Sequence, residues 1–419
     1  MVKKLKYHSL IDKVYTRPNL YVAWEKVKAN KGSGGIDDVS IKEIEQNLML
    51  NIEEIHRLLY EDRYQPQPVK RVWIPKPDGN KRPLGIPTVR DRVVQQAILN
   101  KLTPIFEPKF LDCSYGFRPN RSAHQSIQKV DEYLNSGYRW VVEVDIEKFF
   151  DTINQEKLID FVAEEIADGR VLRLVRSFLH SGVMEDMKIE YQSTGTPQGG
   201  VISPLLANIY LYQFDKEMTE SGYKVIRYAD DIVILCQKKI EAEQALRKTR
   251  EILERELNLK LNPEKTKITH KSKGFEFLGY NFFGYEEGKW KGNWKIPRKR
   301  AIETFKDKIR YLTRRQQPKS MSEIIKEINP VIRGWGNYFI YGTCKRKFWQ
   351  LDCWIRDRVK AYKVRGWGKL AHLKYPNWKL KLMGLCSLSG LLYHRRLELL
   401  LVRGQRYREA VCGKSARTV

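Results

Sequence analysis

Short apolar runs bounded by turn residues predict several strands along the chain. Residues 224–236 (KVIRYADDIVILC) predict two strands joined by a tight turn, with two adjacent aspartates at its tip. Residues 139–150 (RWVVEVDIEKFF) predict another strand, and residues 71–87 (RVWIPKPDGNKRPLGIP) predict a hairpin whose turn is Pro-Asp-Gly. Residues 275–280 (FEFLGY) predict a further strand.

Apolar residues at helical spacing predict helices over much of the remaining chain. Leu20, Trp24 and Val27 share one face of a helix expected within residues 1–30. The other expected helices cover residues 41–59, 91–102, a segment from about 122, 155–168, 170–180, a segment after 200, 240–257, 301–313, 321–332 and 348–364. The absence of internal repeats and low-complexity tracts argues against a solenoid or a disordered basic tail.

Three aspartates accompany the predicted strands. Asp145 lies within an apolar run, and Asp230 and Asp231 lie at the turn of the predicted hairpin. A carboxylate in an apolar run is costly to desolvate unless something neutralises it, and Mg²⁺ binds hard oxygen ligands. Two metals about 3.5–4 Å apart serve in-line phosphoryl transfer. The pattern therefore indicates nucleotidyl transfer on a nucleic acid, although an Asp pair is also ordinary, solvent-facing turn chemistry.

The net charge of +27 indicates an anionic partner, either nucleic acid or a membrane surface. Residues 289–419 hold 33 Lys and Arg against 8 Asp and Glu, whereas residues 1–288 hold 44 against 42. Neither an apolar run of about 18 residues nor a signal-peptide pattern occurs, which predicts a soluble intracellular protein with no membrane partner. The 6 cysteines and 7 histidines lack metal-ligand spacing, so we expect structural thiols and no zinc ribbon or Cys/His nuclease.

The predicted hairpin at residues 71–87 carries a cluster of cations around its turn. Lys76, Lys81 and Arg82 belong to this cluster. One interpretation is a solvated basic hairpin. The other is a mobile hairpin that closes over an incoming triphosphate, where each cation meets developing negative charge.

Two loops carry candidate binding chemistry, each with an ordinary structural alternative. Residues 30–37 (NKGSGGID) lack the GxxxxGK[ST] spacing of a phosphate loop, and from the residues alone a flexible surface turn is the preferred interpretation. Residues 114–121 (SYGFRPNR) suit template contacts through stacking and phosphate pairing, but equally suit core aromatics beside a surface Arg.

Three further positions are candidates for nucleotide binding or catalysis. Phe150, just past the strand that bears Asp145, could exclude a 2′-hydroxyl beneath the sugar of an incoming nucleotide, or could belong to the core. The glycines of residues 195–200 (GTPQGG) precede a helix and permit close approach of the backbone to a ligand. Lys265 is a candidate general acid for a pyrophosphate leaving group, with a surface Lys as the alternative.

In their order and spacing these motifs resemble reverse transcriptases, and most closely the group II intron-encoded reverse transcriptase/maturase family of bacteria and organelles. The resemblance runs along nearly the whole chain and rests on NKGSGGIDDVS, IPKPDGNKRPLGIPT, DRVVQQAI, SYGFRPNRSAH, VDIEKFFDTIN, TPQGGVISPLLANIYL, RYADDIVIL, LNPEKTKI, FLGY and RGWGNYF. It implies an α+β right-hand polymerase, with fingers and palm around an antiparallel palm sheet, followed by an α-helical thumb.

The resemblance implies four regions along the chain. They are an N-terminal extension with the glycine-rich loop (1–45), fingers and palm (46–287), a helical thumb or maturase X region (288–375), and a short basic region that binds DNA or RNA (376–419). Many family members end in a Cys/His endonuclease, and this sequence shows no such cluster. It resembles the shorter, endonuclease-lacking members associated with class C introns, so primers are expected to come from elsewhere.

Matched residue by residue, the resemblance assigns roles to the candidate site. Asp145, Asp230 and Asp231 match the catalytic ligands of two Mg²⁺ ions, and Lys265 remains the candidate general acid. The implied dNTP-binding residues are Lys76 and Arg82 at the triphosphate, Phe150 at the sugar, Gln198 and Gly199 in the pocket, and Ile146 beside both nucleotide and metals. The implied template and primer contacts are Gly34, Gly35 and Arg118, with Leu278 and Gly279 in a primer-grip strand.

The resemblance implies an RNA-directed DNA polymerase that uses dNTPs, an RNA template and a DNA primer. It also implies a protein that binds structured intron RNA to assist splicing and retrohoming, acts at a DNA target, and resides in the cytoplasm near the bacterial nucleoid. One alternative is a splicing-only maturase, whose polymerase site is vestigial. Against it stand the three aspartates, Lys76 and Arg82, because an unused polymerase site has no physical reason to keep costly charges. Another is a reverse transcriptase of a defence, CRISPR-linked or diversity-generating system, over which RGWGNYF favours the intron interpretation.

Overall fold

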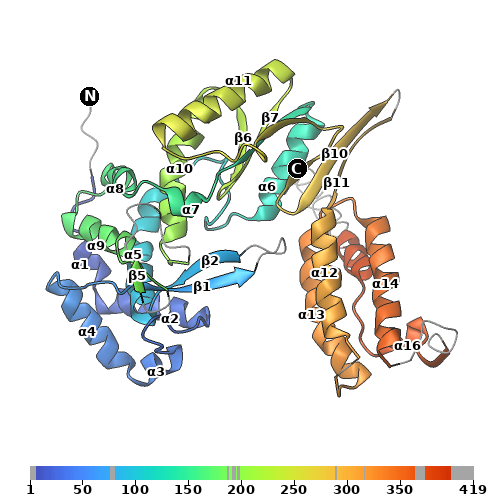
Figure 1. Ribbon diagram of the computed structural model, residues 1–419, viewed down its shortest axis with the longest axis horizontal. Helices are drawn as coiled ribbons and strands as arrows, with labels where there is room; N and C mark the ends of the chain where they lie inside the picture. Colours follow the sequence, from blue (N-terminus) through green and yellow to red (C-terminus); the bar gives the residue numbers. More distant parts are fainter. Residues whose placement is uncertain are drawn as a thin grey trace, which may run out of the picture. The chain divides into compact units, whose positions relative to one another are not determined.

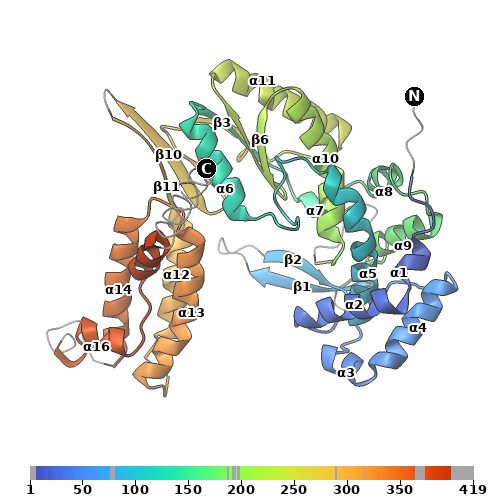
Figure 2. The same cartoon turned by 180° about the vertical axis from the view of Figure 1, so that it is seen from behind.

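The computed structural model describes residues 6–75, 81–185, 188–190, 195, 199–287, 290–315, 317–363 and 373–397. The chain forms two compact units, Met1–His270 and Lys271–Val419 (Figures 1 and 2). Each unit combines helices with largely antiparallel sheet, which confirms the predicted α+β class.

The helices of the first unit follow the predicted apolar periodicity. Leu20, Trp24 and Val27 are buried on α2, as predicted, and Ser40 and Ser122 begin α3 and α6 with reciprocal capping boxes. These helices are α1 (Ile11–Val14), α2 (Arg17–Ala29), α3 (Ile41–Gln46), α4 (Leu48–Tyr60), α5 (Val89–Phe106), α6 (Ala123–Asn135), α7 (Phe149–Thr152), α8 (Gln155–Ala163), α9 (Gly169–Leu179), α10 (Ser203–Glu220) and α11 (Lys239–Arg250), with a 3₁₀ turn η1 (Glu107–Lys109) and a π-helical turn η2 (Glu251–Glu256).

The central sheet of the first unit has the strand order β6-β7-β3-β8 and is antiparallel throughout. Its strands are β3 (Trp140–Asp145), β6 (Lys224–Tyr228), β7 (Asp231–Cys236) and β8 (Lys267–His270). The β-branched residues Val142, Ile232 and Ile234 are buried, since such side chains pack well on a pleated surface. The sheet thus joins the strand that carries Asp145 to the hairpin with the aspartate pair.

A second sheet of the first unit has the order β2-β1-β4-β5. Its strands are β1 (Val69–Pro75), β2 (Lys81–Ile86), β4 (Val183–Glu185) and β5 (Lys188–Glu190). The predicted hairpin is confirmed in β1 and β2, which pair antiparallel, while β1 pairs with β4 in parallel. The turn of this hairpin, residues 76–80, lies outside the described residues.

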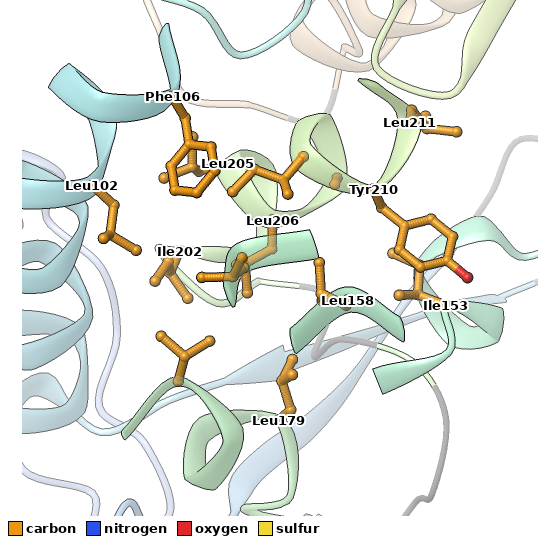
Figure 3. Packing of buried hydrophobic residues seen from close by; sticks show 14 of the residues in the cluster. Leu102, Phe106, Ile153, Leu158, Leu179, Ile202, Leu205, Leu206, Tyr210 and Leu211 are labelled. Carbon is orange, nitrogen blue, oxygen red and sulfur yellow. The ribbon is translucent and has the colours of Figure 1, made fainter. Parts of the chain in front are cut away.

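The core of the first unit is organised around α10. Eleven of its 18 residues are buried, so the helix is covered on nearly all sides rather than along one face. Figure 3 shows Leu205 and Leu206 of α10 beside Leu102 and Phe106 of α5 and Leu158 of α8, all members of one buried cluster. This core fixes the helix on which the central sheet rests.

The second unit combines a three-stranded sheet with a group of helices. The sheet has the order β11-β10-β9 and consists of β9 (Phe275–Phe277), β10 (Tyr280–Glu287) and β11 (Trp290–Pro297). The helices are α12 (Lys299–Leu312), α13 (Met321–Phe339), α14 (Lys345–Lys363) and α16 (Asn377–Leu382), and residues 388–397 are also helical. Trp335 of α13 stacks on Phe305 of α12 with ring centroids 4.7 Å apart, which joins the first two helices.

Two predicted elements are wrong in detail. The strand predicted over residues 275–280 is interrupted, because Leu278 (φ 46°) and Gly279 (φ 79°) form a left-handed turn between β9 and β10. The helix predicted over residues 41–59 is broken at Asn47, whose backbone is not helical, into α3 and α4. In addition, the strand β11 precedes the helices of the region expected to form a helical thumb.

Within the described residues, no helix combines the length and the apolar character needed to cross a bilayer.

The start of the described chain is held against α9 by one carboxylate. The Asp168 side chain accepts hydrogen bonds from the backbone N–H groups of Leu10 (2.7 Å), Ile11 (2.8 Å), Arg170 (3.0 Å) and Val171 (3.2 Å). Burial raises the pKa of Asp168, but the four backbone hydrogen bonds outweigh it and the net pKa is lowered.

We expect Asp168→Asn to lower the free energy of unfolding at pH 7 by about 1–3 kcal/mol, because hydrogen bonds to a charged acceptor are lost. Since the pKa of Asp168 is depressed in the folded state, its contribution is present above about pH 4, the unfolded value, and is lost as the pH falls below it. Urea unfolding of both proteins from pH 7 to pH 3 measures the difference. The exposed Asp12→Asn is the control, and a difference that stays constant down to pH 3 contradicts the expectation.

Candidate active site at the turn between β6 and β7

The three predicted aspartates converge at one end of the central sheet. Tyr228 pairs with Asp231, so Ala229 and Asp230 form a two-residue turn between β6 and β7. Asp145, the last residue of β3, lies directly opposite Asp231 in the antiparallel register of β3 and β7. Opposed residues in such a pair have Cα atoms roughly 4.5–5.5 Å apart, so the carboxylates share one end of the sheet.

The electrostatics of this turn are those of crowded negative charge. Burial raises the pKa of Asp230, and the negative charge of Asp145 raises it further. The positive charges of Arg82 and Arg227 oppose this shift. Arg82, predicted at the triphosphate, therefore lies within electrostatic reach of Asp230.

Lys265 lies at the same carboxylates. Its Nζ is 3.2 Å from Oδ2 and 3.4 Å from Oδ1 of Asp145, and its side chain is 65% exposed. The preceding loop is fixed to β3, because the backbone N–H of Asn262 donates to the carbonyl oxygen of Asp145 at 2.8 Å. Lys265 is thus placed beside the predicted metal ligands.

The donor set fits a divalent cation. Carboxylate oxygens are the hard ligands that such ions take, and a cation would relieve the repulsion that raises the pKa of Asp230. In the part of the chain that the structure describes, no three His, Cys, Asp or Glu side chains are already arranged as a metal-holding group.

The backbone of the turn is packed against the loop at residues 114–121. A Cβ atom on Gly116 would collide with the backbone nitrogen of Ala229, so only glycine permits this approach. The Nδ2 of Asn208, on α10, donates to the carbonyl oxygen of Gly116 at 2.9 Å. The glycine of this loop therefore supports the turn that presents Asp230.

Arg118, predicted as a template contact, is instead a structural residue. Its side chain is only 4% exposed and forms an ion pair with Glu107 at 2.9 Å. Its guanidinium also donates to the carbonyl oxygens of Leu111 and Ser114, at 2.6 and 2.8 Å. These bonds hold the loop together, and a buried, fully engaged guanidinium is not available to a nucleic-acid backbone.

The hairpin of β1 and β2 contacts the glycine-rich segment before α10. A Cβ atom on Gly199 (φ 116°) would collide with the carbonyl oxygen of Gly85, on β2. The two backbones are therefore in direct contact, which places Gly199 beside the strand that begins with Lys81 and Arg82. Lys76 and Gln198, predicted to contact the nucleotide, lie outside the described residues.

Phe150 and Ile146 lie close to Asp145 along the chain. Phe150 is half-buried in α7, with its ring centroid 5.2 Å from that of Phe149. A Cβ atom on Gly195 would lie 2.9 Å from the carbonyl oxygen of Phe150, so α7 contacts the segment that leads to Gly199. Ile146 is 6% exposed and forms an isolated bridge with Leu261, so its side chain belongs to the core.

The glycine-rich loop is packed rather than free. A Cβ atom on Gly35 would lie 2.6 Å from the Cα of Thr88, at the start of α5, and one on Gly34 would lie 2.9 Å from the carbonyl carbon of Asp38. Arg92, on α5, donates a hydrogen bond to the carbonyl oxygen of Ser33. The loop therefore sits at the end of β2 in the first unit.

Leu278 and Gly279, predicted in a primer-grip strand, belong to the second unit. They form the turn between β9 and β10 rather than a strand. The hydroxyl of Tyr338, on α13, donates to the carbonyl oxygen of Leu278 at 2.8 Å, which fixes the turn to that helix.

The residues that support the aspartate turn were not singled out from the sequence. Arg227 and Asp215 form a fully buried ion pair next to the turn. The sequence offered one signal, the charged Arg227 within the apolar run KVIRYADD. Nothing in the sequence pairs Arg227 with a partner on α10.

Comparisons with known proteins identify the family of the chain. Residues 74–282 match the family model of reverse transcriptases (RNA-dependent DNA polymerases), and residues 302–380 match the maturase-specific domain of group II introns. The chain is 37% identical to protein YkfC of Escherichia coli over 284 residues, 59% of this chain and 74% of YkfC.

The chain is also 31% identical to the group II intron-encoded protein LtrA of Lactococcus lactis over 365 residues, 69% of this chain and 60% of LtrA, so it spans less than two thirds of that relative. A chain in a solved structure titled as a partial Cas6-RT-Cas1–Cas2 complex is similar to this one, with 26% sequence identity and a TM-score of 0.39. The match covers 61% of this chain and 45% of that chain. The two family matches and the identity to YkfC and LtrA show that the chain belongs to the group II intron-encoded reverse transcriptases that carry a maturase domain.

Proposed function

We propose that this chain copies RNA into DNA by nucleotidyl transfer at Asp145, Asp230 and Asp231. The observation that carries the proposal is the register of β3 and β7, which sets Asp145 opposite Asp231 and next to the Asp230 turn. Carboxylates crowded in this way, with the pKa of Asp230 raised by burial and by Asp145, are typical of a site that binds cations for chemistry on phosphates.

The proposed metal ions are two Mg²⁺, held by Asp145 and Asp230 with Asp231 and the main chain at Ile146 assisting. When bound, they would lower the pKa of a primer 3′-hydroxyl and offset charge on a triphosphate. Lys265, which is largely exposed, leaves Asp145 and donates a proton to the departing pyrophosphate.

The nucleotide is proposed to lie between β2 and the segment after α7. Arg82, together with Lys76, binds the triphosphate oxygens, where charge-assisted hydrogen bonds are strongest. Phe150 packs against the sugar, and Gln198 and Gly199 border the base. The backbone contact of Gly199 with Gly85 supports this placement, because it ties the pocket segment to the strand that carries Arg82.

The proposed regions are an N-terminal extension (1–45) whose Gly34 and Gly35 contact template, fingers and palm (46–287), a thumb (288–375) and a basic C-terminal region (376–419). The turn at Leu278 and Gly279 would support the primer strand. The proposed setting is the cytoplasm near a bacterial nucleoid, with dNTPs, an RNA template, a DNA primer and a DNA target as partners.

The second unit presents cations stacked on exposed aromatic rings, which supports binding of structured intron RNA. Tyr311, on α12, is 55% exposed, with the guanidinium of Arg314 4.4 Å and the ammonium of Lys308 5.8 Å from its ring centroid. Such pairs join phosphate attraction to a stacking surface for unpaired bases. We propose that this face holds intron RNA during splicing.

We expect Asp230→Ala to reduce Mg²⁺-dependent dNTP incorporation on a primed RNA template by about 100-fold or more, because a group that stabilises transition-state charge is removed. Thermal stability should not fall, since the substitution removes a partly buried carboxylate that is repelled by Asp145. Primer extension and thermal unfolding measure the two effects.

The matched control is the exposed Asp12→Ala, which should extend primers as the wild type does. Wild-type protein that binds group II intron RNA tightly but extends no primer would favour a splicing-only maturase. Equal extension by the wild type and Asp230→Ala would remove Asp230 from the site.

We expect the double substitution Lys308→Ala and Arg314→Ala to weaken binding of structured intron RNA and to make its salt dependence shallower. Loss of two phosphate contacts reduces the slope of log K against log salt by about 1.4–1.8. Filter binding at several salt concentrations measures this slope. The control replaces Lys239 and Lys248 of α11, which contact Glu243 and Ser221, by alanine. An identical change in both double variants would contradict a specific role for the surface formed by Lys308, Tyr311 and Arg314.

A further inference from the structure

A buried ion pair lies directly beneath the aspartate turn. Arg227, on β6, and Asp215, on α10, both have side chains that are 0% exposed, and Nε of Arg227 donates to Oδ1 of Asp215 at 2.8 Å. Arg227 lies three residues before Asp230 along the chain.

The guanidinium of Arg227 also donates to three other residues. Nη1 donates to Oδ1 of Asn208 at 2.9 Å and to the carbonyl oxygen of Ala229 at 3.0 Å, and Nη2 donates to Oγ of Ser114 at 2.7 Å. The guanidinium thus connects α10, the loop at residues 114–121 and the turn itself. Lysine, a point charge with three donors, cannot reproduce this planar fork.

The turn needs such support. Ala229 adopts φ 57°, a left-handed conformation that is unfavourable for a residue with a Cβ atom and persists only where the surroundings enforce it. On one side the backbone of Gly116 packs against Ala229, and on the other Arg227 holds the Ala229 carbonyl. Asp230 is the next residue, so its position depends on these two contacts.

Stability alone does not explain the pair. Replacing a buried ion pair by apolar residues of similar volume is often neutral or stabilising, because two desolvated charges gain little net free energy. An apolar pair would also fill the space between β6 and α10. What it cannot do is donate a hydrogen bond to the carbonyl oxygen of Ala229.

We propose that Arg227 is a positioning residue for Asp230: it locks the left-handed Ala229 turn through the Ala229 carbonyl oxygen, with Asp215 holding the guanidinium in place. The proposal rests on the proposed polymerase function and adds a residue that acts through the turn rather than on substrate. Without the hydrogen bond to the Ala229 carbonyl oxygen, the turn changes conformation and the Asp230 carboxylate moves relative to Asp145. A displacement of about 1 Å can lower a reaction rate 100-fold.

The test is the double variant Arg227→Met with Asp215→Leu in the full chain. Both charges are removed together, so neither is left buried alone, and the fold should persist. Thermal unfolding checks the fold, electron paramagnetic resonance titration with Mn²⁺ alone measures cation binding, and single-nucleotide incorporation gives kcat and KM for a dNTP.

We expect Mn²⁺ affinity and kcat each to fall by about 10–100-fold, as for groups that orient metal ligands. KM for the dNTP should change little, because Arg82 and Gly199 are untouched. A folded double variant with wild-type kcat and wild-type Mn²⁺ affinity overturns the proposal.

Arg227→Lys keeps the test decisive if the double variant does not fold. It retains a charge opposite Asp215 but cannot reach Asp215, Asn208, Ser114 and Ala229 together, so a folded Arg227→Lys protein should show the same direction of change. Wild-type Mn²⁺ binding and kcat in that variant would equally overturn the proposal.

Asp168→Asn is the control for destabilisation without contact to the turn, and should leave Mn²⁺ affinity unchanged. If the wild type itself extends no primer, the polymerase function fails. If the wild type is active and these variants match it, only the positioning role fails.

Discussion

Repulsion between carboxylates is the constraint on which the first unit depends. A sheet that ends in Asp145, Asp230 and Asp231 places like charges next to one another, and burial of Asp230 increases the cost. Nearby cations offset this cost. Lys265 contacts Asp145, and the positive charges of Arg82, on β2, and Arg227, on β6, lower the pKa of Asp230.

The contacts around the turn differ in how deeply they are buried. The buried Arg227–Asp215 pair, Asn208 and the backbone of Gly116 connect the turn to α10, a helix of which 11 of 18 residues are buried. The contacts on the open side involve exposed or half-buried groups such as Arg82, Lys265 and Phe150. This difference suits the proposed function, in which the aspartates would stay in place while each nucleotide enters and leaves.

Local patterns in the sequence predicted many of the elements and the position of the three aspartates at strand ends. Alternating β-branched residues identified β3, β6 and β7, and the two strand ends then brought Asp145 and Asp231 together. The same patterns did not predict features that depend on contacts between distant parts of the chain. Arg118 looked like a surface cation in a polar loop, but its guanidinium is buried against Glu107 and the backbone carbonyl groups of Phe110, Leu111 and Ser114. Leu278 and Gly279 looked like part of a strand, because the flanking aromatics hide a left-handed turn. The partner of Arg227 lies twelve residues away on another element, and no local rule connects the two.

The contact between Lys265 and Asp145 means that the resting site carries its own counter-ion. In the proposed function, a metal ion that enters would replace this cation rather than add to it, so the total charge at the end of β3 would change less between the two states. Because the lysine is 65% exposed, it can leave into water without disturbing the core. Under the proposed function, Lys265 would neutralise Asp145 in the resting protein and would give up this position when the metal ions bind.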